Sequence, residues 1–149
     1  ENNIRDKGEY QLTNALENMK AKGTKFIPGK VDEWLDCGNK DATVFTNQRV
    51  LENTKGNTDK RLLHPESKNA QIIEPCFIGN NVLIENSVIG PHASIGKDSI
   101  IKDSKIKNSI LQTNCKISQA EISDSMFGNF TEYSGKTNNA SIGDYSTHH

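Results

Sequence analysis

The chain has 149 residues and a formal net charge of −1 at pH 7, with 33% hydrophobic and 6% aromatic residues. This length suits one ordinary domain or two small ones. The near-neutral charge excludes a global attraction to nucleic acid or to an anionic membrane, and no apolar run approaches the length of a membrane span. The small apolar fraction disfavours a thick globular core and favours a repeat fold, in which each unit buries only a narrow stripe.

The three cysteines, Cys37, Cys76 and Cys115, lie far apart and match no disulfide or metal-binding spacing. We therefore expect reduced thiols in a cytoplasmic protein. The chain opens with "ENNIRDKGEYQL", which already runs into a helical pattern, so we expect a fragment of a longer protein. The terminal pair His148 and His149 is either native or the remnant of a tag, and we assign it no function.

The N-terminal section, residues 1–52, has a mixed α/β pattern. Apolar residues at helical spacing predict an amphipathic helix that ends at Gly23; they are Leu12, Ala15, Leu16 and Met19. The segment "KFIPGKVDEW" then predicts a β-hairpin, because Pro28 and Gly29 suit the two central positions of a type II turn.

A second helix is expected from about Asn39 to Glu52, with Asn39 as its N-cap and Asp41 in its first turn. Its apolar side should carry Ala42, Phe45 and one or more of Val44, Val50 and Leu51. A section of this size does not close a core of its own.

The next segment, residues 53–70, is polar and is interrupted by Gly56 and Pro65. This composition predicts a linker, with a short turn at Leu62 and Leu63.

From Gln71 onward, aliphatic residues recur every five or six positions, as in "FIGNNVLIENSVIGPHASIG". Neither a helix, with its period of 3.6, nor a strand, with its period of 2, produces that spacing. The predicted inward positions are Ile72, Ile78, Ile84, Ile89, Ile95, Ile101, Ile106, Leu111, Ile117 and Ile122. A second set follows many of these by four residues and should pack beneath the neighbouring coil: Val82, Val88, Ala93, Ser99, Ile110 and Cys115.

A period near six predicts a short strand followed by a tight turn, with three such units closing one triangular coil. Gly, Asn and Asp allow the left-handed backbone conformation that tight turns require. We therefore expect a parallel β-helix from about Ile72 to Ile122, with roughly ten units in three to four coils. The late "SIGDYS" segment, from Ser141 to Ser146, is either a terminal cap or an additional partial coil.

The "I-G-x-x-x-x" pattern resembles the left-handed β-helix of hexapeptide-repeat proteins and covers about half of the chain. The expected fold is thus mainly β, with a left-handed parallel β-helix and its terminal cap over 71–149, after a short α/β section. The pattern is more specific for fold than for function, because acyltransferases, nucleotidyltransferases and other proteins share it.

Two motifs in the N-terminal section resemble the end of the catalytic domain of bacterial sugar-1-phosphate nucleotidyltransferases, and most closely of glucose-1-phosphate thymidylyltransferases with a solenoid tail. In that family a "G-E-x-x-[IL]-T-[DN]" segment opens a helix, and a "W-x-D-x-G" segment follows about two dozen residues later. Both occur here, at Gly8 to Asn14 and at Trp34 to Gly38, and the predicted β-helix follows in the expected place.

The resemblance implies roles for three residues. Glu9 matches a carboxylate on the sugar-binding side, Trp34 matches a residue beside the sugar phosphate, and Asp36 matches one of two aspartates that hold Mg²⁺. The implied partners are a nucleoside triphosphate and a sugar-1-phosphate, and the implied reaction gives a nucleotide sugar and pyrophosphate. Mg²⁺ fits this chemistry, because it is commonly held by one or two carboxylates together with phosphate oxygens.

The chain also departs from the family pattern. It has no glycine-rich "G-G-x-G-T-R-L" loop, no first metal aspartate and no "E-K-P" sugar segment, and Asn14 stands where many relatives have Asp. We therefore expect residues 1–52 to be the C-terminal remnant of the catalytic domain. The chain alone should be inactive and should hold no cofactor, and its β-helix should serve the assembly or the regulation of the full-length protein.

Two other functions stay open. A hexapeptide acyltransferase would use a histidine general base between coils, and His92 is the candidate, although no long excursion loop interrupts the repeat; we expect His92 in a solvated turn and His64 exposed in the linker. The other is a pure oligomerisation module, and we expect a homo-oligomer, a trimer before a dimer. The lysines of the repeat alternate with acidic residues and lack interleaved aromatics, so neither nucleic acid nor membrane is an expected partner.

Overall fold

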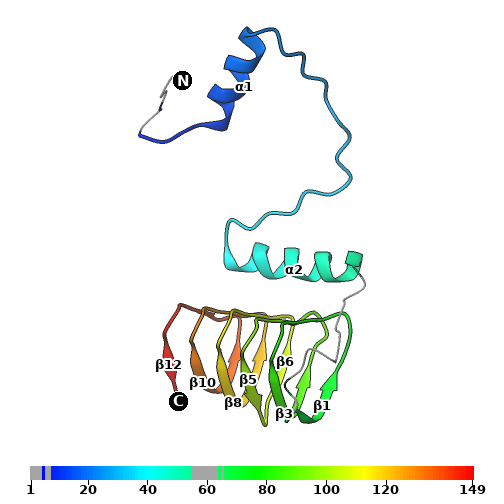
Figure 1. The fold of residues 1–149 in the computed structure, drawn as a ribbon, viewed down its shortest axis with the longest axis vertical. Helices are drawn as coiled ribbons and strands as arrows, with labels where there is room; N and C mark the ends of the chain where they lie inside the picture. The colour runs from blue at the N-terminus through cyan, green and yellow to red at the C-terminus, as the bar shows by residue number, and fades with distance from the viewer. Residues whose placement is uncertain (1–4, 6–7, 55–63, 65) are drawn as a thin grey trace. The chain divides into compact units, whose positions relative to one another are not determined.

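The computed structural model describes residues 5, 8–54, 64 and 66–149. The chain forms two compact units, Glu1–Trp34 and Leu35–His149. The described residues contain two helices and twelve strands, so the prediction of a mainly β chain is confirmed (Figure 1).

In the first unit, helix α1 (Leu12–Ala21) forms where the apolar spacing predicts it. It ends in a Schellman motif, because Gly23 has φ +90°, its N–H donates to the Lys20 carbonyl, and the N–H of Thr24 donates to the Met19 carbonyl. The helix buries none of its residues.

The predicted hairpin after α1 is wrong, because residues 24–37 contain no strand. A two-stranded hairpin is marginal in water unless it packs on something else, and Phe26, Ile27 and Val31 are all exposed here.

The second unit begins with the segment that leads into helix α2 (Lys40–Thr54). Asn39 caps this helix as predicted, since its Oδ1 accepts the N–H of Ala42 at 2.9 Å. The predicted apolar side needs one correction. Val44 and Leu51 are buried, whereas Phe45 is 54% exposed and Val50 is 46% exposed. Most of the segment predicted as a linker, including Leu62 and Leu63, lies outside the described residues.

The strands that follow are short and lie between Lys68 and His148. They are β1 (Lys68–Ile72), β2 (Phe77–Ile78), β3 (Leu83–Ile89), β4 (Ser94–Ile95), β5 (Ile100–Lys102), β6 (Lys105–Lys107), β7 (Ile110–Leu111), β8 (Lys116–Ser123), β9 (Met126–Phe127), β10 (Glu132–Asn138), β11 (Ser141–Ile142) and β12 (Thr147–His148).

All of these strands pair in parallel, coil upon coil, and so form the predicted parallel β-helix. One sheet has the order β11-β9-β7-β4-β2, and the other runs from β1 to β12 around two sides of the coil. The stack starts before Ile72 and ends after Ile122, and "SIGDYS" is an additional coil, because β11 pairs with β9. Successive coils shorten, as shown by the partner series Phe77, Ser94, Ile110, Met126 and Ser141. Three full six-residue units would need about 18 residues, and the five-residue steps account for the difference.

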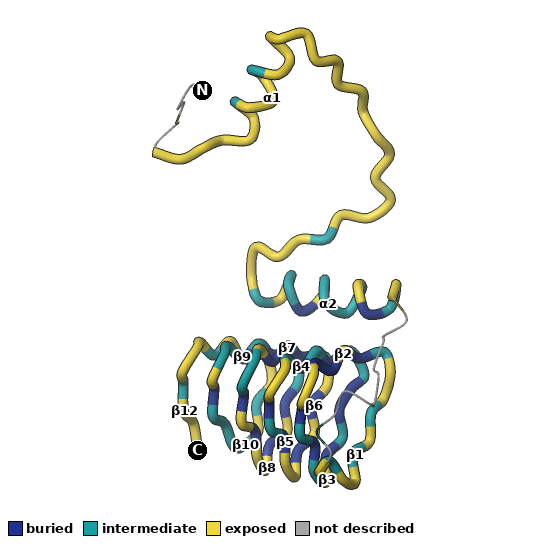
Figure 2. The backbone as a smooth tube through the Cα atoms, viewed as in Figure 1, coloured by how far each residue is buried: buried dark blue, intermediate teal, exposed yellow. Residues whose placement is uncertain are grey.

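The predicted inward aliphatic residues form the core of this solenoid. Nine of them, from Ile78 to Ile122, are at most 2% exposed, and Ile72 packs against them half-buried. Phe127 continues the same series one step beyond the prediction and is 1% exposed. Figure 2 shows the buried positions recurring from coil to coil.

The second set of inward positions is correct at Val82, Ala93, Ser99 and Cys115 but wrong at Val88 and Ile110, where Ser87 and Ser109 are buried instead. In a strand, residues two apart share a face, so the small buried residue always lies two positions before the next aliphatic. In a five-residue unit, the small buried residue therefore lies three residues after the preceding aliphatic residue, and not four. The buried serines stack axially, and Ser87 Oγ accepts the N–H of Ser104 at 3.0 Å.

Thirteen non-glycine residues of the described part have positive φ, and most are Asn or Asp, as the turn chemistry predicts. Most lie in turns between strands, whereas Asn69, Asn86 and Gln119 lie within β1, β3 and β8. Gly96 serves a different purpose. A Cβ there would lie 2.6 Å from the carbonyl carbon and oxygen of Gln112 on the next coil, so this glycine permits close approach of two backbones.

Neither helix of the described residues has the length and apolar content needed to cross a membrane.

Candidate functional site

Asp36 lies in the segment that joins residue 34 to α2, and its carboxylate shapes a tight turn. Oδ1 accepts the N–H of Cys37 at 2.7 Å and that of Gly38 at 3.1 Å. Oδ2 accepts no hydrogen bond from any described residue. The side chain is exposed, so one carboxylate oxygen is fixed and the other is available to an incoming ligand.

The neighbouring residues hold this turn in place. Thr46 of α2 donates its hydroxyl to the Asp36 carbonyl at 2.6 Å. A Cβ on Gly38 would lie 3.3 Å from Asp36 Oδ2, so a larger residue there would press on the free carboxylate oxygen. The glycine two residues after Asp36 thus leaves Oδ2 of the carboxylate accessible.

Helix α2 is docked on the solenoid by one stripe of side chains. Lys40, Val44, Asn47 and Leu51 recur at i, i+4, i+7 and i+11, which places them on one side of a helix. Val44 and Leu51 are 4% and 5% exposed. Figures 1 and 2 show α2 running along the stacked coils, beside the side that carries β2, β4, β7 and β9.

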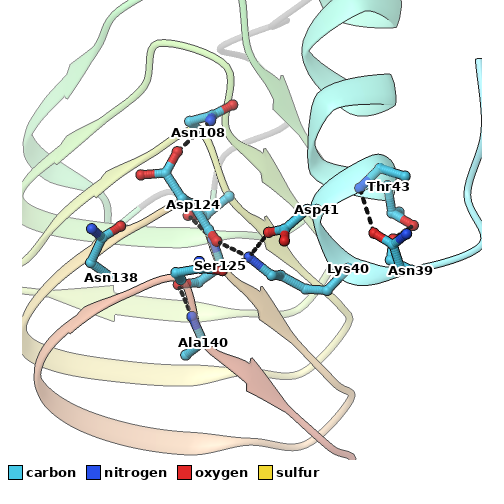
Figure 3. Close-up of polar contacts among 12 residues, drawn as sticks. Asn39, Lys40, Asp41, Thr43, Asn108, Asp124, Ser125, Asn138 and Ala140 are labelled. Carbon is cyan, nitrogen blue, oxygen red and sulfur yellow. Dashed lines mark hydrogen bonds and ion pairs between the residues drawn. The ribbon is translucent and has the colours of Figure 1, made fainter.

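The two polar residues of this stripe, Lys40 and Asn47, form hydrogen bonds to the coils. Near the start of α2, the Lys40 ammonium donates to the Asp124 carbonyl at 3.0 Å and contacts Asn139 Oδ1 and Asp41 (Figure 3). Its side chain is only 16% exposed. Further along, Asn47 donates to the His92 carbonyl at 3.3 Å and accepts the Ser94 hydroxyl at 2.6 Å. A half-buried ammonium that donates to a main-chain carbonyl is a specific anchor, because an unpaired charge there would be costly.

His92 occupies a turn, as predicted, with φ +62°. It is not solvated, however, because its side chain is 20% exposed and its Nε2 lies 3.3 Å from Glu52 Oε1 of α2. Side-chain hydrogen bonds from Gln48 and Arg49 hold the pKa of Glu52 below its usual value. The imidazole is thus engaged in helix docking and not presented to an open groove as a general base would be. His64 is half-buried and not exposed as predicted. Its Nδ1 accepts the N–H of Glu66.

The other two residues singled out from the sequence lie in the first unit. Glu9 is exposed, and Trp34 is 82% exposed; Asp36 belongs to the second unit. No group of three or more His, Cys, Asp or Glu residues that could hold a metal occurs in the described part of the chain. A single carboxylate such as Asp36 still fits Mg²⁺, which often takes one or two protein carboxylates and completes its shell with water and phosphate oxygens.

The docking residues Lys40, Asn47 and Ser94 were not predicted from the sequence. The sequence does contain a pattern for the docking side of α2, because four residues follow the helical period: Lys40, Val44, Asn47 and Leu51. Two of the four are polar, however, and a search for apolar residues alone favours Phe45. Nothing in the local sequence marks Ser94 as a partner, since that contact joins residues 47 positions apart.

Comparison with known proteins supports the resemblance that the motifs indicate. No protein-family model matches the chain. It is similar to the glucose-1-phosphate thymidylyltransferase of Streptomyces griseus, with 26% identity over 126 residues. The similarity covers 75% of this chain and 36% of that enzyme, so the chain matches about a third of the length of its relative. This partial similarity and the solenoid both fit the resemblance that the motifs and the repeat indicate.

Proposed function

We propose that the chain is the C-terminal part of a sugar-1-phosphate nucleotidyltransferase, which converts a nucleoside triphosphate and a sugar-1-phosphate into a nucleotide sugar and pyrophosphate. The observation that carries this proposal is the similarity to the Streptomyces griseus enzyme over 75% of the chain. Because that relative is a glucose-1-phosphate thymidylyltransferase, thymidine triphosphate and glucose-1-phosphate are the first substrates to test. The proposed compartment is the cytoplasm.

Asp36 is the residue of this chain proposed to contact Mg²⁺. The geometry supports the role, because Oδ1 is fixed by two backbone N–H groups while Oδ2 accepts no hydrogen bond from the described residues. Mg²⁺ bound there would offset phosphate charge, and Asp36 would contribute one negative ligand in a fixed direction. Glu9 and Trp34 are proposed to contact the sugar and its phosphate.

The solenoid is proposed to serve assembly and to hold the Asp36 segment. Thr46 ties the Asp36 carbonyl to α2, and Lys40 and Asn47 tie α2 to the coils. This chain of contacts gives the solenoid a means of fixing one wall of an active site. The rest of that site, including the glycine-rich phosphate loop, has no counterpart in these 149 residues, so the chain alone is proposed to be inactive.

The test is the rate of pyrophosphate release by the full-length protein and its Asp36→Asn variant at saturating Mg²⁺. Asparagine keeps the shape but removes the charge, so turnover should fall about 100-fold or more, as for the loss of one preorganised electrostatic contact. Asp32→Asn, which removes an exposed carboxylate that pairs with Lys30 at the surface, is the matched control and should retain nearly full activity. Equal rates for wild type and Asp36→Asn would show that Asp36 only shapes the turn. Turnover by the 149-residue chain alone would contradict the proposal that the rest of the active site lies outside these residues.

A further inference from the structure

A groove of about 550 Å³ lies on the side of the solenoid that carries β6. We name this side the β6 face; it consists of the C-terminal part of β3, all of β6, and the C-terminal halves of β8 and β10. Its lining includes the apolar Val88 and the polar or charged residues Lys105, Lys107, Glu121, Ser123, Lys136 and Asn138. A volume in this range matches that of ordinary small-molecule sites.

Strand register arranges the polar residues of the β6 face in two rows across the coils. Lys105, Glu121 and Lys136 are direct partners on successive strands and form the first row. Lys107, Ser123 and Asn138 form the second row. Parallel strands lie about 4.8 Å apart, so each row presents its side chains at a spacing that one phosphate or diphosphate group can bridge.

The charges of the first row are only partly balanced. Lys136 pairs with Glu121 at 3.0 Å. The Lys136 hydrogen bond and charge hold the pKa of Glu121 below its usual value, and Lys105 and Lys107 add to the same effect through their charges. Glu121 therefore stays ionised near neutral pH, and a single carboxylate stands among three ammonium groups.

The second row has hydrogen-bond donors but no carboxylate. Within the described residues, the ammonium groups of Lys105 and Lys107 form no hydrogen bond or ion pair. The Ser123 hydroxyl donates to Asn138 Oδ1 at 2.9 Å, which leaves the Asn138 amide N–H groups available. The groove thus combines excess positive charge with free N–H donors.

The neighbouring side, which we name the β5 face, consists of β5 and the N-terminal parts of β1, β3, β8 and β10. It provides a comparison, because its lysines are ion-paired. Glu85 pairs with Lys68 at 2.9 Å and with Lys102 at 3.2 Å. Lys116 pairs with Glu132 at 2.6 Å. Among the described residues, lysines without an ion-pair partner are therefore a feature of the β6 face and not of the β5 face, and they line the groove.

We propose that the groove on the β6 face binds a small molecule that carries a phosphate or diphosphate group, with Lys105 and Lys107 as the main contacts. An ammonium group that has no other partner donates strong, charge-assisted hydrogen bonds to phosphate oxygens. The apolar edge at Val88 leaves room for an organic substituent on the phosphate. This proposal is independent of the proposed function, because it concerns binding to the solenoid and not turnover.

The probe is inorganic pyrophosphate, titrated into the complete 149-residue chain at low salt and followed by backbone amide NMR shifts. We expect saturable shifts at Lys107, Ser123 and Asn138, with a dissociation constant of ~1 mM or tighter. Orthophosphate in a parallel titration distinguishes a diphosphate site, which binds it more weakly, from a monophosphate site, which binds it equally well.

The variant is Lys105→Gln with Lys107→Gln, and the matched control is Lys102→Gln with Lys116→Gln, which removes the same charge from the β5 face. The groove pair should raise the dissociation constant about tenfold, and the control pair by less than about twofold. Lys107→Gln alone should give an intermediate loss, and it replaces the double variant if circular dichroism shows that the double variant is unfolded. Shifts that do not saturate, or an equal loss in groove and control variants, would overturn the proposal. A groove variant that dissociates an oligomer without changing pyrophosphate binding would assign the groove to a second copy instead.

Discussion

Single residues of the solenoid are constrained by the coil that lies next to them, and Gly96 shows this most directly. An alanine Cβ at this position would meet the Gln112 backbone at 2.6 Å. Gly143 follows Ile142 in the same "I-G" pattern but lies in the last coil, where a Cβ would meet nothing within 4 Å. The same sequence motif is therefore under a steric constraint at one position and free of it at the other.

We predict that Gly96→Ala destabilises the protein by about 1–3 kcal/mol, because two backbones must move apart. Gly143→Ala should change the free energy of unfolding by less than about 0.5 kcal/mol. Urea denaturation followed by circular dichroism measures both values. Equal stability of the two variants would show that the coil spacing relaxes easily at Gln112.

The three thiols lie in different environments. Burial raises the pKa of Cys76 to about 11 and also raises the pKa of Cys115, whereas Cys37 is exposed. Because the thiolate is the reactive form, we predict that iodoacetamide at pH 8 modifies only Cys37 in the native protein and modifies all three thiols after unfolding. Peptide mass mapping identifies the sites, and rapid native labelling of Cys76 would contradict the buried placement.

At the scale of elements, α2 belongs with the solenoid, although its sequence connects it to the motif at Asp36. The helix is held by the Lys40 and Asn47 contacts and by the burial of Val44 and Leu51. This docking is the physical link between the candidate metal ligand and the coils.

We predict that Lys40→Ala with Asn47→Ala loosens α2 without unfolding the solenoid. Loss of these anchors should lower the free energy of local opening of the helix by about 1–3 kcal/mol, so its amides should exchange faster with solvent deuterium. The core strand β8 should keep its protection. Asn53→Ala, on an exposed position of the same helix, is the control and should leave exchange unchanged; similar exchange in all three proteins would mean that α2 is held by its apolar residues alone.

The solenoid was predictable from the sequence because its code is local. An aliphatic residue every five or six positions identifies the core, and nine of ten predicted positions are fully buried. Val88 was mistaken for a core position because a fixed offset of four ignores the pleat, which places Ser87 and not Val88 on the same side as Ile89.

The docking of α2 was not predictable, because its contacts join residues 40 to 99 positions apart. The candidate site depended on resemblance at Glu9, Trp34 and Asp36. Local geometry explains only the turn at Asp36, and the roles of all three residues stay predictions.

At the scale of the whole molecule, we predict self-association, with a trimer favoured over a dimer. The solenoid presents flat sheet faces formed by its stacked parallel strands. Ordered sheet faces promote association between chains. Light scattering at micromolar concentration gives the mass of the particle, and a monomer would contradict the prediction.

The docking of α2 also has a consequence for the order in which the second unit folds. Hydrogen bonds between coils join residues only about one coil apart, such as Ser104 to Ser87 at a separation of 17. The contacts of Lys40, in contrast, reach Asp124 and Asn139, at separations of 84 and 99 residues. Because closing a longer loop costs more entropy, nearest-neighbour coils can zip up first, one after another. Lys40 has no complete binding site until the turns at Asp124 and Asn139 are stacked, so α2, which comes first in this unit, is the last part of it to reach its native place.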